Sequence, residues 1–402
     1  MSEPQVLGLT TGAPVGNWRA IACSADGTNL VTFEAPAAAR DAAQIYTSQN
    51  RGTDWTLTSA PVDQWAALAS SVDGSKLVAV AGSADSTYSG PIISSADFGA
   101  RWTQTSAPLR PWSSVASSTN GNWLVAATYD GAIYVSSDSA ATWTQTGAPS
   151  NDWWAVAISA DGARMAAAPR NGPVYISTNG GGAWTQTGPP HPPDWTAWST
   201  NQPRLTWWIG LAMSADGMKL VAAAGGEGGI FTSADGGVSW QQAGGPSGWS
   251  SVASSADGTR LAAAGPGLYL STDSGATWTR AGITVTAGCV ALSADGTKLT
   301  AGTSAPTIAG RDNGVIFVAQ TFPLEPAPRL NVISTNGCIS LSWRVALTGY
   351  ALQENSSLDP ASWVDVTWLT EGLVFLDVSH QAESQAVLGE MGPRRFFRLK
   401  EE

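Results

Sequence analysis

The chain has 402 residues, enough for more than one domain, yet only 13% are charged, while Gly (44) and Trp (20) are abundant. The net charge is −11 with 20 Lys and Arg in no basic cluster, which argues against nucleic acid as a partner. No run of 18 apolar residues is present, which argues against a membrane-spanning helix, and the few Cys and His give no metal or disulfide spacing.

The first segment, residues 9–14 (LTTGAP), matches residues 143–149 (WTQTGAP) when both are aligned on the Trp that follows. The later copy ends a repeating unit, so the N-terminal copy is the end of a unit whose beginning lies elsewhere in the chain. We therefore expect residues 5–12 to complete the seventh unit, which lacks a fourth strand after residues 316–318, and this would close a ring and leave no open edge.

A phrase of the form W-x-x-(V/I/L)-A-x-S-x-(D/N)-G then recurs seven times between Trp18 and Asp295, at spacings of 47, 47, 41, 55, 41 and 38 residues. A period of 40–50 residues with several short strands in each unit predicts an all-β, seven-bladed propeller. The Asp residues of the phrase are expected to form turns. Six of the copies start with Trp, and we expect these six to pack between blades rather than ring the channel entrance: Trp18, Trp65, Trp112, Trp153, Trp208 and Trp249.

A second phrase, S-x-(D/N)-x-(G/A)-x-x-W, lies between successive copies of the first and ends at Trp55, Trp102, Trp143, Trp184, Trp240 and Trp278. It resembles the Asp-box, the bacterial neuraminidase repeat, and the chain resembles secreted, multi-copy propellers of environmental, Verrucomicrobia-like bacteria. The resemblance implies that the box joins the third and fourth strands of a blade and is structural. The family includes sialidases, xyloglucan-active hydrolases, sortilin-type receptors and a photosystem assembly factor, so the fold leaves function open.

Sialidases of this family share an Arg triad, an (F/Y)-R-I-P segment and a Tyr–Glu pair, and this chain has no such segment; Arg19 is the nearest approach to it. We therefore expect no catalytic residues, metal or cofactor.

The repeat turns should share one face of the propeller, the constant face, and the fourth-to-first and second-to-third connections the other, the variable face, where function is expected. Charged residues that the repeat does not explain fall on the variable face: Glu34, Arg40, Asp41, Asp63, Asp85, Arg110, Asp130, Asp152, Arg170, Asp194, Arg204, Glu227, Arg311 and Asp312. They are either solvated loop charges or the source of a carboxylate pair for glycoside hydrolysis.

An insertion at residues 188–208 precedes the fifth repeat and adds three tryptophans to amide and charged side chains. Such residues suit a sugar or an aromatic ligand, because rings stack on apolar faces while polar groups bond hydroxyls. The other interpretation is a loop that plugs the channel. The candidate ligand-binding residues are His191, Asp194, Trp195, Trp198, Asn201, Arg204 and Trp207.

The propeller is expected over residues 1–320 and a Pro-rich linker over residues 321–329. Short strand patterns in residues 330–402 predict a small β-sandwich. The function expected is that of a non-enzymatic scaffold, secreted, periplasmic or at the cell surface, which binds a glycan or a protein through the variable face. The alternatives are a glycoside hydrolase and an assembly factor for a membrane complex.

Overall fold

The computed structural model describes residues 8–14, 16–35, 43–188, 207–226, 228–243, 248–281, 287–303 and 314–320, and seven strands between residues 331 and 401. The chain divides into two compact units, Met1–Phe322 and Pro323–Glu402. Within the described ranges no helix is long and apolar enough to span a membrane.

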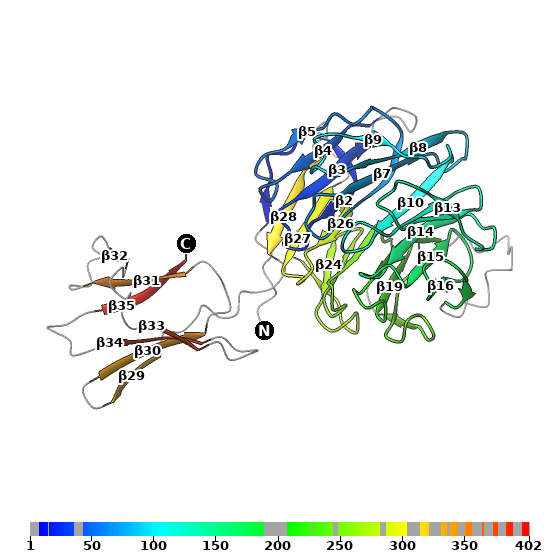
Figure 1. The fold of residues 1–402 in the computed structure, drawn as a ribbon. Coiled ribbons are helices and arrows are strands. Elements are labelled where there is room, and N and C mark those ends of the chain that lie inside the picture. Colours follow the sequence, from blue (N-terminus) through cyan, green and yellow to red (C-terminus); the bar gives the residue numbers. More distant parts are fainter. Residues whose placement is uncertain are drawn as a thin grey trace. The chain divides into compact units, whose positions relative to one another are not determined.

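The first unit is a seven-bladed propeller in which every blade is a four-stranded antiparallel sheet, and in blades 1 to 6 the strands follow one another in sequence order (Figure 1). Blades 1 to 3 comprise β2 (Asn17–Cys23), β3 (Leu30–Ala35), β4 (Ile45–Ser48) and β5 (Thr56–Leu57); β6 (Trp65–Ser70), β7 (Leu77–Gly82), β8 (Ser89–Ser95) and β9 (Thr103–Gln104); and β10 (Trp112–Ser117), β11 (Leu124–Thr128), β12 (Ile133–Ser136) and β13 (Thr144–Gln145). Blades 4 to 6 comprise β14 (Trp153–Ile158), β15 (Met165–Pro169), β16 (Tyr175–Ser177) and β17 (Thr185–Gln186); β18 (Trp208–Met213), β19 (Leu220–Ala224), β20 (Ile230–Ser233) and β21 (Gln241–Ala243); and β22 (Ser251–Ser254), β23 (Leu261–Ala264), β24 (Leu268–Ser271) and β25 (Thr279–Arg280).

Blade 7 is built from both ends of this unit. Its inner strands are β26 (Ala287–Leu292), β27 (Lys298–Thr303) and β28 (Ile316–Gln320), and its outer strand is β1 (Gly8–Thr10). The pairing is antiparallel, with Leu9 opposite Val318. The predicted closure by an N-terminal strand is therefore confirmed, and Figure 1 shows the yellow strands of blade 7 beside the blue strands of blade 1.

The recurring S-x-(D/N)-G phrase forms the turn between the first and second strands. In blade 6 the Ser255 hydroxyl donates to Asp257 Oδ1 at 2.6 Å and accepts from the Arg260 amide at 3.0 Å, while the Thr259 amide donates to the same carboxylate at 2.9 Å. Gly258 has φ +65°, a conformation that favours glycine. The turn thus satisfies its own backbone, which explains why the phrase recurs.

A ring of backbone hydrogen bonds joins these turns around the axis of the propeller. The residue after each turn serine donates its N–H to the carbonyl of the equivalent residue in the next blade, at 2.7–3.1 Å, and the seventh bond returns to the first blade. The members, in order, are Ala25, Val72, Thr119, Ala160, Ala215, Ala256 and Ala294. If neighbours lie about 4.8 Å apart, as hydrogen-bonded strands do, the ring is only about 11 Å across between backbone centres. The channel is therefore narrow on the constant face.

A separate hydrophobic cluster fills each of the seven seams between neighbouring blades in the described part of the ring. The Trp that begins a first strand lies in the seam with the preceding blade; Trp112, for example, is fully buried against residues of blade 2. All six of these tryptophans are at most 4% exposed. The prediction that they pack between blades is confirmed, and blade 7 carries Ala287 at this place.

The second unit contains two antiparallel sheets, described by itself. One has the strand order β29-β30-β34-β33 and the other β32-β31-β35. Their bounds are β29 (Asn331–Thr335), β30 (Cys338–Arg344), β31 (Tyr350–Asn355), β32 (Val364–Asp365), β33 (Leu373–Leu376), β34 (Glu383–Leu388) and β35 (Phe396–Glu401). These sheets establish an all-β unit, and the packing of the two sheets as a sandwich stays a prediction.

Candidate functional site

A β-bulge at the start of the first strand determines which side chains lie at the channel end on the variable face. In six blades the register shifts between the repeat's first residue (Trp, or Ala287 in blade 7) and the residue two positions later, as between Trp153 and Ala155. A bulge leaves its extra residue unpaired and redirects its side chain. The residues at this second position are Arg19, Ala66, Ser113, Trp154, Ile209 and Gly288, so Arg19 and Trp154 are the large ones.

The residue directly after the one that pairs with the repeat's first residue, at the end of the second strand, also lies on this face. Tyr129 and Arg170 directly follow β11 and β15. Register places Ala35, Gly82, Gly225 and Pro266 at the equivalent positions of blades 1, 2, 5 and 6. Blades 3 and 4 therefore carry long side chains where these blades carry a small residue or proline.

These large side chains meet at the channel mouth. The rings of Tyr129 and Trp154 lie edge to face with centroids 5.4 Å apart and an interplanar angle of 66°. The Arg170 guanidinium carbon lies 5.4 Å from the centroid of the Trp154 ring, a cation–π arrangement. Burial raises the pKa of Tyr129, and the charge of Arg19 on blade 1 opposes this rise although blade 2 lies between the two blades. We call Arg19, Tyr129, Asp152, Trp154 and Arg170 the mouth cluster.

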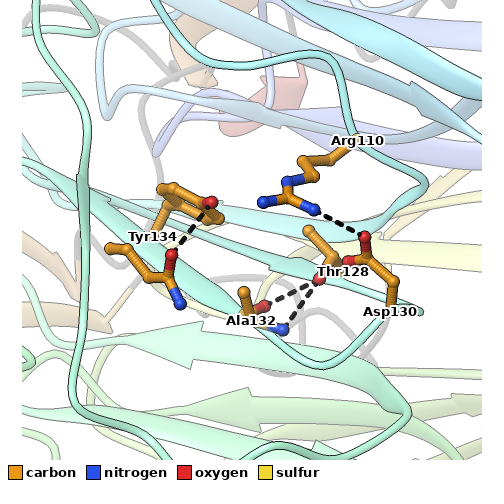
Figure 2. Close-up of polar contacts among 6 residues, drawn as sticks. Arg110, Thr128, Asp130, Ala132 and Tyr134 are labelled. Atoms are coloured by element: carbon orange, nitrogen blue, oxygen red, sulfur yellow. Dashed lines mark hydrogen bonds and ion pairs between the residues drawn. The ribbon is translucent and has the colours of Figure 1, made fainter.

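Tyr129 lies on the tight turn that follows β11, and Figure 2 shows Thr128 and Ala132 of this turn bonded to each other. The Thr128 hydroxyl donates to the Ala132 carbonyl at 3.0 Å and accepts from the Ala132 amide at 2.9 Å. The Trp153 indole of blade 4 donates to the Gly131 carbonyl at 3.3 Å. The turn that carries Tyr129 is thus held from both sides, so the site is preorganised.

An ion pair lies on the same turn and is shown in Figure 2. Arg110 Nη1 is 3.0 Å from Asp130 Oδ2, and both side chains are partly exposed. A surface ion pair of this kind stabilises the fold by only about 0–1 kcal/mol, because solvent screens the two charges. Its structural effect is to neutralise both charges beside the mouth cluster.

Blades 4 and 5 fix Arg170 in the same manner. Its backbone amide donates to the Asp152 carbonyl at 2.6 Å, and its carbonyl accepts from the Trp208 amide at 3.2 Å. The Trp208 indole donates to the Gly172 carbonyl at 2.8 Å. At four other seams the indole nitrogen has no hydrogen-bond partner among the described residues: Trp18, Trp65, Trp112 and Trp249.

The pKa values in the mouth cluster reflect its partial burial. Burial is the main cause of the raised pKa of Tyr129, which Arg19 and Arg170 oppose and Asp152 reinforces. Burial also raises the pKa of Asp152, against the effect of Arg170. The cluster thus contains two cations, one carboxylate and a neutral hydroxyl around an indole ring, a positive excess on an acidic chain.

The described acids of the variable face do not form a visible pair. Asp63 accepts a hydrogen bond from the Tyr88 hydroxyl, and Asp85 caps its own turn by accepting from Ser83 and from Thr87. Burial raises the pKa of Glu34, with no contribution from a second carboxylate, and the same holds for Asp152. The remaining predicted charges of this face lie outside the described residues: Arg40, Asp41, Asp194, Arg204, Glu227, Arg311 and Asp312.

Of the seven candidate ligand residues, the structure describes only Trp207; His191, Asp194, Trp195, Trp198, Asn201 and Arg204 lie outside the described residues. Trp207 is half-buried against the second-to-third turn of blade 5, where a Cβ on Gly225 would lie 2.9 Å from its Nε1. The insertion thus begins at Gly188 of blade 4 and ends at Trp208, whose amide donates to the Arg170 carbonyl.

Sequence reasoning missed Tyr129 and Trp154. Both are departures from the repeat: Trp154 stands where other blades have Ala66, Ser113 or Ile209, and Tyr129 stands where two blades have glycine. Comparison of each repeat position across the blades could have found them. In the described part of the chain no three His, Cys, Asp or Glu side chains gather as a metal site.

No family model and no curated protein sequence matches the chain. Solved structures do match at a TM-score of 0.54. They include the GH74 xyloglucanase from Xanthomonas campestris, at 14% identity over 84% of this chain, of whose length the chain spans only 59%. They also include YCF48 from Cyanidioschyzon merolae, at 13% identity over 78% of this chain and 98% of that one, and YCF48 bound to D1 peptide, at 14% identity over 81% and 100%. At these identities the likeness establishes the seven-bladed propeller fold that the chain shares with these proteins.

Proposed function

We propose that this protein is a non-enzymatic Asp-box propeller of the secreted, periplasmic or surface-attached type, which binds a segment of a partner protein at the mouth of its channel. The observation that carries this proposal is the mouth cluster. Its Trp154, Tyr129 and Arg170 side chains belong to the three residue types that supply most hot-spot energy in protein interfaces. They are also held rigidly, which lowers the entropic cost of binding.

The geometry favours a peptide over a sugar at this place. Arg170 lies over the Trp154 ring and Tyr129 stands against it, so the indole is less open for a pyranose to stack on. Arg19 and Arg170 outnumber Asp152, which suits a segment that carries a carboxylate. That YCF48 has been solved with a D1 peptide makes a peptide ligand reasonable for a propeller of this shape.

The ring of turns makes the channel narrow on the constant face, so a ligand would enter the channel from the variable face, where the mouth cluster lies. The insertion at residues 188–208 ends beside the mouth cluster, because the Trp208 amide donates to the Arg170 carbonyl. Assembly of a membrane complex is one role that such peptide binding could serve.

A peptide-library selection against the whole chain, followed by calorimetry on the enriched peptides, tests the proposal. Trp154→Ala should raise the Kd about 30-fold, the loss typical of a central hot spot. Ala66 stands at this position in blade 2, so the variant should fold. The control is Trp123→Arg on the constant face, because Arg164 is its counterpart in blade 4. Equal affinities of Trp154→Ala and the wild type for every enriched peptide would refute binding at the mouth.

The second candidate is a glycoside hydrolase, which the raised pKa values of Glu34 and Asp152 favour. Against it stands the lack of a second carboxylate acting on either group, since paired carboxylates normally perturb each other. A reducing-sugar assay on soluble polysaccharides decides between the two functions. Product release that Asp152→Asn abolishes would establish the hydrolase, and no release is expected.

A further inference from the structure

The seam between blades 1 and 2 departs from the repeat on the constant face. In six blades the second residue after the turn glycine has a long side chain: Lys76, Trp123, Arg164, Lys219, Arg260 and Lys298. Lys76 Nζ, for example, reaches blade 3 and donates to Asn122 at 2.8 Å and to Ser139 at 3.0 Å. Blade 1 has the short Asn29, whose amide reaches only the Asp73 carbonyl, at 2.8 Å. The long cationic or aromatic side chain that bridges the other seams is therefore missing here.

Blade 2 places an aromatic ring at this seam, at a position that disfavours one. Phe98, in the third-to-fourth turn, has φ +59°, and its counterparts include Ser139, Gly180, Gly236 and Ser274, all at positive φ. The left-handed region is costly for a bulky side chain, and residues held there cluster at functional places. Phe98 is only partly buried and belongs to none of the seam clusters found in the described residues.

A hollow of about 630 Å³ opens beside Phe98 between the two blades. Leu57 lines it from β5 and is 50% exposed, although the equivalent residue is Gln104, Gln145 or Gln186 in blades 2 to 4. Phe98 and Leu57, two apolar residues at positions where other blades carry small or polar residues, thus border the same hollow.

The polar part of the lining excludes anionic ligands. It contains the exposed Gln49 and Asp54, whose carboxylate accepts from the Asn50 amide at 2.8 Å, and no Lys or Arg. The hollow between blades 2 and 3, in contrast, is lined by Lys76 and Arg101. An uncharged ligand with many hydroxyls therefore suits the first hollow, because a carboxylate and an amide bond hydroxyl groups while the apolar side chains cover a ring face.

We propose that the hollow between blades 1 and 2 is a subsite for a neutral oligosaccharide. One pyranose ring lies against Phe98 and Leu57, and its hydroxyls bond Asp54 and Gln49. The subsite is independent of the peptide-binding mouth, since it occupies the outer part of the opposite face. It would attach the propeller to neutral polysaccharide while the mouth holds a protein.

Affinity electrophoresis of the full chain in gels that contain xyloglucan, mixed-linkage β-glucan or galactomannan tests this proposal, with polygalacturonate as the anionic probe. At least one neutral polymer should retard the wild-type protein. Phe98→Ser should weaken that binding about tenfold, as loss of a ring contact does. Because Ser139 and Ser274 adopt the same φ, this variant keeps the turn. Leu57→Gln restores the residue of the other blades and should weaken binding as well.

Val238→Ala is the matched control, because Val238 is 80% exposed in the corresponding turn of blade 5 and Ala100, Ala141 and Ala276 are its counterparts. It should leave retardation unchanged. The proposal is overturned if no neutral polymer retards the chain, if only polygalacturonate does, or if Phe98→Ser is retarded like the wild type. Loss of retardation in Trp154→Ala but not in Phe98→Ser would place the glycan at the mouth and would also overturn it.

Discussion

Deletion of residues 1–12 removes the strand that closes the ring, and its cost can be worked out from the contacts of that strand. Three ladder pairs between β1 and β28 are lost. The Thr11 amide also loses the Ile316 carbonyl at 3.1 Å, and its hydroxyl loses the Trp55 indole at 3.3 Å. The Gly12 amide loses the Gly52 carbonyl at 3.2 Å. These amount to about six hydrogen bonds, each with a net effect of about 1 kcal/mol. For a unit of this size, about 2 °C per kcal/mol predicts a melting temperature about 10 °C lower.

Thiol labelling reports on the same seam. The Cys23 thiol donates to the Leu292 carbonyl at 3.2 Å and the Cys289 thiol to the Trp18 carbonyl at 3.7 Å, both between blades 1 and 7. Burial raises both pKa values to about 12, so the intact ring should resist a thiol reagent at neutral pH. In a Cys338→Ser background the deletion should allow both to react well below the melting temperature. Deletion of residues 1–7, which precede β1, is the control; a full deletion that melts and labels like this control would refute closure by β1.

Two further predictions concern the turns and the seams. Burial opposes the ionisation of Asp26 and Asp257, yet hydrogen bonds within the turn lower both pKa values to about 2. The ionised carboxylates therefore stabilise the fold above about pH 4, and this stabilisation is lost as the pH falls toward 2. The melting temperature should therefore be flat above about pH 5 and should fall steeply below about pH 4; a flat profile down to about pH 2.5 would contradict the role given to the turns. Gly82→Ala should destabilise by about 3 kcal/mol, because its Cβ would lie 2.3 Å from the backbone nitrogen of Trp112, whereas Gly147→Ala, with no atom within 4 Å, should be neutral. Equal melting temperatures for these two variants would show that the seams yield more easily than the close contact implies.

The features that recur from blade to blade could be predicted from sequence because each appears six or seven times. The turn Asp257 and the seam Trp112 each have one physical role that is repeated in most blades, so the repetition both identifies the role and assigns it to structure. The missing fourth strand of blade 7 could be found in residues 8–10 for the same reason, since a ring of identical units has only one place for a displaced copy.

The mouth cluster could not be found by repetition because it consists of exceptions. Trp154 follows Trp153 directly, and strand alternation alone does not indicate where its ring points; the bulge after Trp153 decides this. Asp85 shows the opposite error. Its charge falls outside the seven-fold repeat, yet Ser83, Asp85 and Thr87 repeat the S-x-D-x-(S/T) pattern of other turns and make the same hydrogen bonds.

The central claim is that a partner segment binds at the mouth of the channel on the variable face. A crystal structure of the chain with an enriched peptide tests this claim most directly. We predict peptide density in contact with Trp154 and Arg170, with a peptide carboxylate near Arg19. Peptide density on another surface, with Trp154 still covered only by Tyr129 and Arg170, would contradict the assignment.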